Sequence, residues 1–118
     1  MAVPPPISVL LPVRDGAAHI SEAIVSIEAQ TFTEYEVIAV DDGSTDDSWI
    51  LLQEWADRDE RVKVFKQSPQ GIVPALEHAR REAAGPYLAR MDADDVSLPK
   101  RFEKQVKFLN SNLEVAVV

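Results

Sequence analysis

Residues 35–48 read YEVIAVDDGSTDDS, and this stretch decides the fold class. Its first six residues, YEVIAV, form a mostly apolar run with three β-branched side chains, which is typical of a buried strand. The run stops at the letters DDG, which favour a turn. Ser44 and Asp47 then fit a capping box, so we expect a helix to begin at Ser44. A buried strand followed directly by a helix is the repeating step of an α/β fold.

The same step repeats along the chain. Further strands are expected at residues 7–13, 61–66 and 87–91, with helices at residues 17–30, at residues 71–84 and from Pro99 onward. A fifth strand is expected at residues 114–118, where the last residue cuts it short. Four alternations predict a single α/β domain over residues 1–118. Its mostly parallel sheet would carry helices on both faces, joined by right-handed crossovers.

Each expected helix carries an apolar stripe at helical spacing, and these stripes supply the core. The residues expected to point inward are Ile20, Ala23, Ile24 and Ile27 in the first helix, Leu51, Leu52 and Trp55 in the second, Ile72, Leu76, Ala79 and Ala83 in the third, and Phe102, Val106 and Leu109 in the fourth.

The composition excludes several classes of function. With 12 basic against 20 acidic residues and a formal net charge of -8, the chain has no basic stripe for nucleic acid. Its lack of cysteine excludes disulfides, thiolate metal sites and cysteine nucleophiles. Prolines break the apolar N-terminal run, which therefore reads as neither a secretion signal nor a membrane span. We expect a cytoplasmic domain.

Charged residues follow three of the first four expected strands, at the point where each strand ends. They are Arg14 and Asp15 after the first strand, Asp41 and Asp42 after the second, and Asp92, Asp94 and Asp95 after the fourth. Because the carboxyl ends of parallel strands meet at one edge, where such sheets bind ligands, we expect these side chains to gather there.

The densest acidic group is DADD, residues 92–95. Two carboxylates about 4 Å apart repel by about 4 kcal/mol at an effective dielectric of about 20, so the group needs either a cation or full solvation. Oxygen-only ligation by a D-x-D at a strand end suits Mg²⁺ or Mn²⁺. The alternative is a solvated acidic turn in which one aspartate caps the helix at Pro99.

Asp41 and Asp42 also allow two interpretations. They either form a turn ahead of the helix or offer a carboxylate to a ligand N–H or sugar hydroxyl. Since neighbours on a strand point to opposite sides, we expect Asp42 to face the ligand and Asp41 to support it from behind. Arg14 either meets a diphosphate or pairs with a carboxylate, and pairing is the stronger expectation. Arg90, in an expected central strand, needs a carboxylate partner from the acidic group.

Other patterns that carry chemistry are weak or missing. Neither G-x-G-x-x-G nor G-x-x-x-x-G-K-[ST] occurs, which disfavours a classical dinucleotide fold and a P-loop enzyme. His19 and His78 have no partner at a suggestive spacing, so surface or capping roles are expected for both. Because both phosphate-binding motifs are missing, any phosphate bound here would rely on a metal.

Several short motifs nevertheless occur together in one order: ISVLLPVRDG, SIEAQTF, VIAVDDGSTDDS, GIVPALEHAR, the A-x-G-P-Y-L ahead of MDADD, and the S-L-P-x-R-F after it. In this ordered combination, across essentially the whole chain, the sequence resembles the family 2 glycosyltransferases of GT-A fold. The resemblance implies a Rossmann-like fold that binds a nucleotide diphosphate-sugar, with UDP as the default nucleotide. It also implies inverting transfer of the sugar to a glycan or lipid-linked acceptor, in polysaccharide or cell-envelope synthesis.

The resemblance implies roles for particular residues as well. The implied nucleotide-binding residues are Pro12, Val13 and Arg14 against the base and ribose, Asp42 with Asp41 as the acid that hydrogen-bonds the base, and Asp92 near the ribose. Asp94, with Asp92, is the implied ligand of the Mn²⁺ or Mg²⁺ that bridges the diphosphate. Asp95 is implied to reach the metal shell or the donor sugar.

The chain departs from the family pattern at two positions and in length. Relatives often carry an aromatic residue where Arg14 stands and an Asn where Glu77 stands. They also continue past Val118, so we expect the acceptor portion and the catalytic base to be absent here, and donor binding without transfer. Apolar surface at the truncated end is expected to favour a homodimer. The full-length protein is expected in the cytoplasm or at the cytoplasmic face of a membrane.

Two rival functions remain at this point. Receiver domains of signalling proteins have a similar length and alternation, but they place acids after the first and third strands and a lysine after the fifth. Here the acidic groups at residues 41–42 and 92–95 follow the second and fourth strands, and neither Lys63 nor Lys66 replaces that lysine. The other rival is a non-catalytic interaction domain that keeps the fold without the chemistry.

Overall fold

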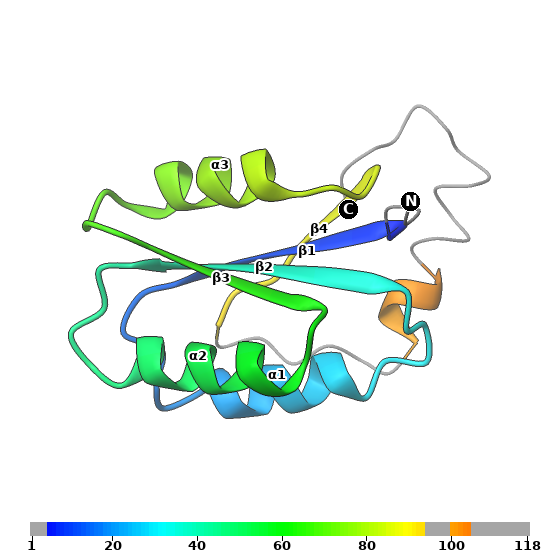
Figure 1. Ribbon diagram of the computed structural model, residues 1–118, viewed down its shortest axis with the longest axis horizontal. Helices are drawn as coiled ribbons and strands as arrows, with labels where there is room; N and C mark the ends of the chain where they lie inside the picture. The colour runs from blue at the N-terminus through cyan, green and yellow to red at the C-terminus, as the bar shows by residue number, and fades with distance from the viewer. Residues whose placement is uncertain (1–4, 94–99, 105–118) are drawn as a thin grey trace.

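The computed structural model describes residues 5–93 and 100–104. Over that part the chain forms a four-stranded sheet of order β3-β2-β1-β4, in which every neighbouring pair is parallel. The strands are β1 (Ile7–Val13), β2 (Tyr35–Asp42), β3 (Val62–Gln67) and β4 (Tyr87–Arg90), and the helices are α1 (Ile20–Glu28), α2 (Ser48–Arg58) and α3 (Ile72–Glu82). Helices α1 and α2 cover one face of the sheet and α3 covers the other (Figure 1). The expected α/β architecture is confirmed.

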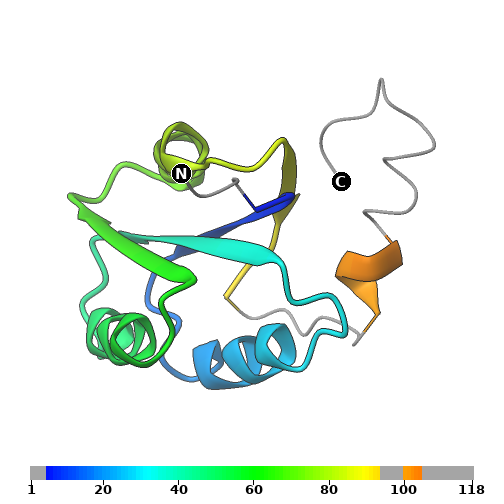
Figure 2. The same ribbon diagram turned by 45° about the vertical axis from the view of Figure 1, so that its right-hand side comes forward.

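The two central strands carry the core because both of their faces are covered and most of their side chains are apolar. Every residue of β1 and of β2 is buried. Val9 and Leu11 belong to the apolar cluster that includes α1 and α2, whereas Leu10 between them belongs to the cluster that includes α3. Figure 2 shows these two helical layers on opposite sides of the twisted sheet. A parallel strand covered on both sides reads as a continuous apolar run, which explains why the sequence marks both strands clearly.

Helix α2 begins at Ser48 and not at Ser44. Strand β2 continues through Asp41 and Asp42, so these acids lie in the strand and not in a turn after it. The hydroxyl of Ser44 donates to Asp41 and accepts a hydrogen bond from the amide of Asp15, so it is not available as a helix cap. The capping prediction was wrong because the buried carboxylate of Asp41 takes this donor.

The stripe predicted for α3 also needs correction. Ala75 and Ala79 are its fully buried residues, whereas Ile72 is 50% exposed. The side chain of Ile72 lines a cavity at the carboxyl edge of the sheet instead of packing in the core. An apolar residue in the first turn of a helix therefore satisfied the helical spacing without facing the strands.

The segment around β4 differs from expectation in one respect. Strand β4 is an outer strand over the described residues, so Arg90 does not lie in a central strand there. Its half-exposed guanidinium pairs with Asp92, with Arg90 Nε 3.3 Å from Asp92 Oδ1, and the expected carboxylate partner is confirmed. Phe102 is fully buried, as expected. Val106, Leu109 and the predicted strand at residues 114–118 lie outside the described residues.

Over residues 5–93 and 100–104, none of the helices combines the length and the apolar character that a membrane crossing needs.

One buried carboxylate, Glu36 of β2, holds the amino edge of the sheet. Glu36 Oε2 accepts hydrogen bonds from Ser8 Oγ at 2.5 Å and from the amide of Ala84 at 2.5 Å, while Glu36 Oε1 lies 3.3 Å from Lys63 Nζ. The amide of Gly85 also reaches Glu36 Oε2, at 3.3 Å. Burial alone would raise the pKa of Glu36, but the hydrogen bonds from Ser8 and Ala84 and the charge of Lys63 lower the pKa below its ordinary value. One ionised side chain thus connects β1, β2, β3 and the turn ahead of β4.

Replacing this carboxylate tests its contribution. Glu36→Gln should lower the free energy of unfolding by about 1–3 kcal/mol at pH 7, because an amide cannot accept hydrogen bonds at both of its ends. Since the folded-state pKa is lowered, the wild-type contribution is complete above the unfolded-state pKa and is lost as pH falls through the folded-state pKa. Urea unfolding should therefore show a gap between wild type and variant that narrows in acid.

A matched control is Glu54→Gln on the exposed face of α2, which should change the free energy of unfolding by no more than about 0.5 kcal/mol. Equal effects of the two substitutions at pH 7 would contradict the role given to Glu36.

Candidate functional site

The carboxyl ends of β1 and β2 open onto a cavity of about 190 Å³. Its lining residues are Pro12, Val13, Arg14, Asp42, Gly71, Ile72 and Ala75. The first four were predicted from the sequence as binding residues, and the structure brings them together. The cavity is smaller than the roughly 300–1,000 Å³ that encloses a drug-sized ligand, so it suits one ring or one part of a larger molecule.

Three of the lining residues, all from the start of α3, were missed by the sequence-based prediction. Gly71 has a φ of 103°, in the left-handed region that favours glycine, and it precedes the first residue of α3. The sequence signal that could have predicted these lining residues is the glycine between the carboxyl end of a strand and a helix. The apolar stripe of the helix instead led to the prediction that Ile72 packs in the core.

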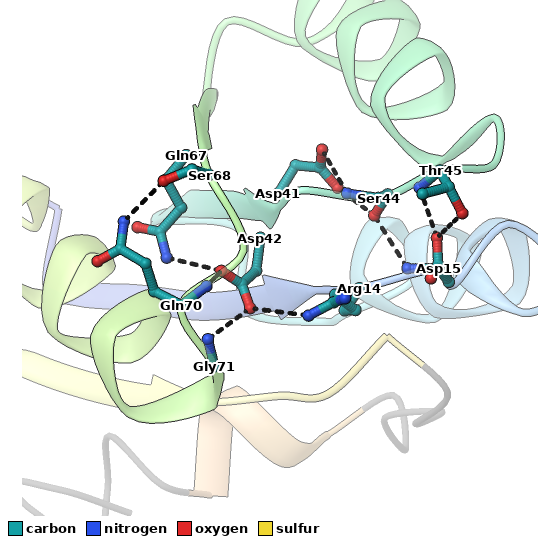
Figure 3. A network of polar contacts seen from close by, with 10 residues as sticks. All are labelled: Arg14, Asp15, Asp41, Asp42, Ser44, Thr45, Gln67, Ser68, Gln70 and Gly71. Atoms are coloured by element: carbon teal, nitrogen blue, oxygen red, sulfur yellow. Dashed lines mark hydrogen bonds and ion pairs between the residues drawn. The ribbon is translucent and has the colours of Figure 1, made fainter.

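Asp42 is the buried carboxylate of this cavity, and the residue is 3% exposed (Figure 3). Asp42 Oδ1 accepts hydrogen bonds from Gln67 Nε2 at 2.9 Å and from the amide of Gln70 at 2.8 Å. Asp42 Oδ2 accepts one from the amide of Gly71 at 2.9 Å. Arg14 Nη1 lies 3.9 Å from the same oxygen. The carboxylate therefore ties the end of β3 and the start of α3 to β2.

The surroundings keep Asp42 ionised and leave it one acceptor position. Burial alone would raise the pKa of Asp42, but the hydrogen bonds from Gln67, Gln70 and Gly71 and the charge of Arg14 lower the pKa below its ordinary value. A carboxylate offers about four lone-pair directions, and three are taken by donors among the described residues. At 3.9 Å, Arg14 is too distant for a hydrogen bond. A ligand N–H or O–H in the cavity thus meets an ionised acceptor.

Arg14 borders the cavity from the loop after β1. Its side chain is 53% exposed, and its ion pair with Asp42 confirms the expectation that it pairs with a carboxylate. A half-exposed guanidinium at the mouth of a cavity has donors to spare for an anion. The two expectations for Arg14 are therefore compatible in this geometry.

Gln67 and His78 were not singled out as site residues by the sequence, yet Gln67 contacts Asp42 and His78 contacts Gln67. His78 Nδ1 lies 3.0 Å from Gln67 Oε1, and the imidazole packs against the ring of Phe65 with 5.4 Å between centroids. Gln67 contacts Asp42 through its other amide atom. Nothing in the local sequence signals this arrangement, because it joins the end of β3 to the second turn of α3.

Asp41 supports neighbouring loops and does not line the cavity. Its carboxylate accepts a hydrogen bond from the hydroxyl of Ser44, whose oxygen accepts one from the amide of Asp15 at 2.9 Å. Asp15 in turn accepts a hydrogen bond from the amide of Thr45 at 2.6 Å. The loops after β1 and β2 therefore hold each other (Figure 3). This placement follows the alternation of side chains along a strand.

Asp92 lies on the same edge, next to the loop after β1. A Cβ added to Gly16 would be 3.0 Å from Ala93 Cβ, which shows how closely the two loops approach. The Asp92 side chain is 42% exposed, and its accessible carboxylate is an oxygen donor of the kind that Mg²⁺ and Mn²⁺ prefer. Within residues 5–93 and 100–104 there is no group of three or more His, Cys, Asp or Glu side chains that could hold a metal ion. The other two predicted acids, Asp94 and Asp95, lie outside the described residues.

Comparison with known proteins identifies the family. The family described as glycosyl transferase family 2 matches residues 8–118. The chain belongs to this family. Among curated relatives of this family 2 chain, the putative glycosyltransferase EpsE of Bacillus subtilis is 34% identical over 97% of the chain and 42% of its own length. The bifunctional glycosyltransferase pgtA of Dictyostelium discoideum is 37% identical over 97% of the chain and 17% of its own length.

Solved structures give the same fold for the family 2 chain. Residues 1–349 of S. aureus TarS in complex with UDP-GlcNAc superpose with a TM-score of 0.82 at 25% identity, covering 89% of this chain and 31% of that one. The mannosyltransferase PcManGT of Pyrobaculum calidifontis, in complex with GDP-Man and Mn²⁺, gives 0.79 at 28% identity, covering 91% and 33%. The fold is the GT-A fold of glycosyltransferases. The chain spans less than half the length of these relatives.

The contacts of Asp42 make a stability prediction for this edge. Asp42→Asn should lower the free energy of unfolding by about 1–3 kcal/mol, because an amide group would face the amide of Gly71 and the guanidinium of Arg14, donor against donor. The measurement is urea unfolding at pH 7. Asp57→Asn on the exposed side of α2 removes the same charge and should cost less than about 0.5 kcal/mol. Similar losses in both variants would be inconsistent with the role given to Asp42.

Proposed function

We propose that this chain binds the nucleotide diphosphate-sugar donor of a glycosyltransferase at the carboxyl edge of its sheet. The observation that carries the proposal is the cavity in which Pro12, Val13 and Arg14 surround the ionised carboxylate of Asp42. Support comes from relatives that are named as glycosyltransferases, and from structurally similar proteins solved in complex with UDP-GlcNAc or GDP-Man.

In the proposed complex the base of the nucleotide occupies the cavity. Asp42 accepts a hydrogen bond from an N–H of the base at the acceptor position that the protein leaves open. Pro12, Val13 and Ile72 form the apolar walls against the ring and exclude water from that hydrogen bond. Arg14 stands at the mouth of the cavity, where its guanidinium reaches toward the ribose and the diphosphate.

Asp92 and Asp94 are the residues that would hold Mn²⁺ or Mg²⁺, and Asp95 would adjoin the donor sugar. When bound, such an ion supplies Lewis-acid stabilisation of the charge that develops on the leaving diphosphate. The accessible carboxylate of Asp92 beside the loop after β1 fits that ion, and a neighbour binds Mn²⁺ together with GDP-Man. Arg90 pairs with Asp92 and orients its carboxylate along this edge.

We further propose that transfer is inverting, with a glycan or lipid-linked hydroxyl as acceptor, in polysaccharide or cell-envelope synthesis. The general base that accepts the proton of that hydroxyl is assigned to sequence outside these 118 residues, because the relatives extend well beyond the matched segment. The chain by itself is then expected to bind donor without transferring the sugar.

Nucleotide binding tests the proposal directly. UDP or GDP at about 100 times its Kd, with Mn²⁺, should raise the free energy of unfolding by about 2.7 kcal/mol, because a ligand that binds only the folded state stabilises it by mass action. Thermal shift and calorimetry would measure this effect with and without Mn²⁺. Asp42→Ala should weaken binding under both conditions, whereas Asp94→Ala should remove only the part that depends on Mn²⁺.

Asp57→Ala is the matched control and should bind as wild type does. A flat response to both nucleotides would contradict the proposal and favour a non-catalytic interaction domain. Phosphorylation of an aspartate by acetyl phosphate would favour a receiver domain instead.

A further inference from the structure

Asp42 is held from one side by a hydrogen-bonded chain that begins on α3. His78 Nδ1 lies 3.0 Å from Gln67 Oε1, and Gln67 Nε2 lies 2.9 Å from Asp42 Oδ1. All three residues are at least partly buried. These hydrogen bonds connect the second turn of α3 through the last residue of β3 to the last residue of β2.

The donor and acceptor roles along this chain follow from Asp42. An ionised carboxylate only accepts hydrogen bonds, so the amide nitrogen of Gln67 must face Asp42. The amide oxygen of Gln67 then faces His78, and His78 Nδ1 must carry the hydrogen that completes the contact. The contact between His78 and the ring of Phe65 holds the imidazole in the orientation that this requires.

The two oxygens of Asp42 have different partners. Asp42 Oδ1 accepts from both Gln67 Nε2 and the amide of Gln70, and these two donors occupy it. Asp42 Oδ2 accepts from the amide of Gly71 and lies beside Arg14. The remaining acceptor position is therefore on Oδ2, the oxygen next to the guanidinium that borders the cavity.

We propose that Gln67 and His78 are positioning residues for the binding of the nucleotide: they fix the rotation of the Asp42 carboxylate so that Oδ2 is presented to the base. The inference rests on the proposed function, since it concerns how the same carboxylate meets the ligand. Neither residue contacts the ligand itself. Both act through Asp42.

The test is the Kd of UDP in the presence of Mn²⁺, measured by calorimetry on the 118-residue chain. Gln67→Met keeps the shape of the side chain but cannot donate, and it should weaken binding about fivefold at pH 8. His78→Leu and His78→Asn both lose the ring contact with Phe65, but only the asparagine can still donate to Gln67. His78→Leu should weaken binding about threefold, and His78→Asn should recover most of that loss.

A pH series separates positioning from a merely structural role. The groups that face Asp42 are Arg14 from the loop after β1, the amides of Gln70 and Gly71, and Gln67, with His78 behind it. Burial raises the pKa of Asp42 and the hydrogen bond from Gln67 lowers it, so removing this donor should raise the pKa of Asp42. The ratio of the Kd of Gln67→Met to the wild-type Kd should therefore increase as the pH is lowered from 8 to 5. Titration of the phosphate affects both Kd values equally and cancels in this ratio.

The controls keep the outcome decisive. Gln53→Met, on the exposed face of α2, makes the same substitution away from the site and should bind as wild type does. The double variant Gln67→Met, His78→Leu should bind no more weakly than Gln67→Met alone. The reason is that the single substitution already breaks the series of hydrogen bonds from His78 to Asp42. If Gln67→Met fails to fold, the comparison of His78→Asn with His78→Leu decides.

Unchanged affinity in Gln67→Met at every pH, or equal losses in His78→Asn and His78→Leu, would overturn the inference while leaving the donor site intact. A wild-type chain that binds neither UDP nor GDP would overturn the proposed function and this inference with it.

Discussion

The parallel pairing of β1 with β2 is the constraint on which the site depends. The register places Val13 opposite Asp41, so the two strands end at nearly the same level. Arg14 and Asp42 then follow at that level, one in the loop after β1 and the other at the end of β2. Because both strands are buried on both faces, a slip by one residue would move apolar side chains between the two layers of the core. The same packing that stabilises the sheet therefore sets the spacing of the two residues that we propose bind the nucleotide.

A buried carboxylate at the end of a strand is costly unless donors satisfy it. For Asp42 the donors come from β3, from the start of α3 and, as a nearby charge, from the loop after β1. Apolar packing positions β3 and α3, whereas hydrogen bonds to the loop after β2 hold the loop after β1. The site is thus the meeting point of four pieces of chain that are well separated in sequence, and a nucleotide would meet a carboxylate whose orientation is set before binding.

Part of this arrangement could be predicted from the sequence, and the reasons are specific. The continuous apolar runs of β1 and β2 marked two strands buried on both faces, and strand alternation separated Asp42, in the cavity, from Asp41, behind it. The spacing of Ile20, Ala23, Ile24 and Ile27 gave the buried face of α1. These features follow from local periodicity, which a single sequence displays.

The errors arose where contacts distant in sequence decide the surroundings of a residue. Ser44 fits a capping box, but it hydrogen-bonds across the loops to Asp41 and Asp15. Ile72 fits a helical stripe, but it faces a cavity. Gln67 and His78 lie 11 residues apart in the chain, and only the packing of α3 on the sheet brings them together. Such pairings depend on tertiary structure, so no local pattern displays them.

Helix α3 is docked at both of its ends by carboxylates of the same strand. Asp42 accepts the amides of Gln70 and Gly71 just ahead of the helix, and Glu36 accepts those of Ala84 and Gly85 just after it. Hydrogen bonds at both ends of the helix oppose sliding along the sheet and rocking about either end. The α3 wall of the cavity is therefore restrained at both ends, whereas Arg14 on the opposite rim is half-exposed and makes only a long ion pair with Asp42, so its side chain is the more adjustable part of the cavity lining.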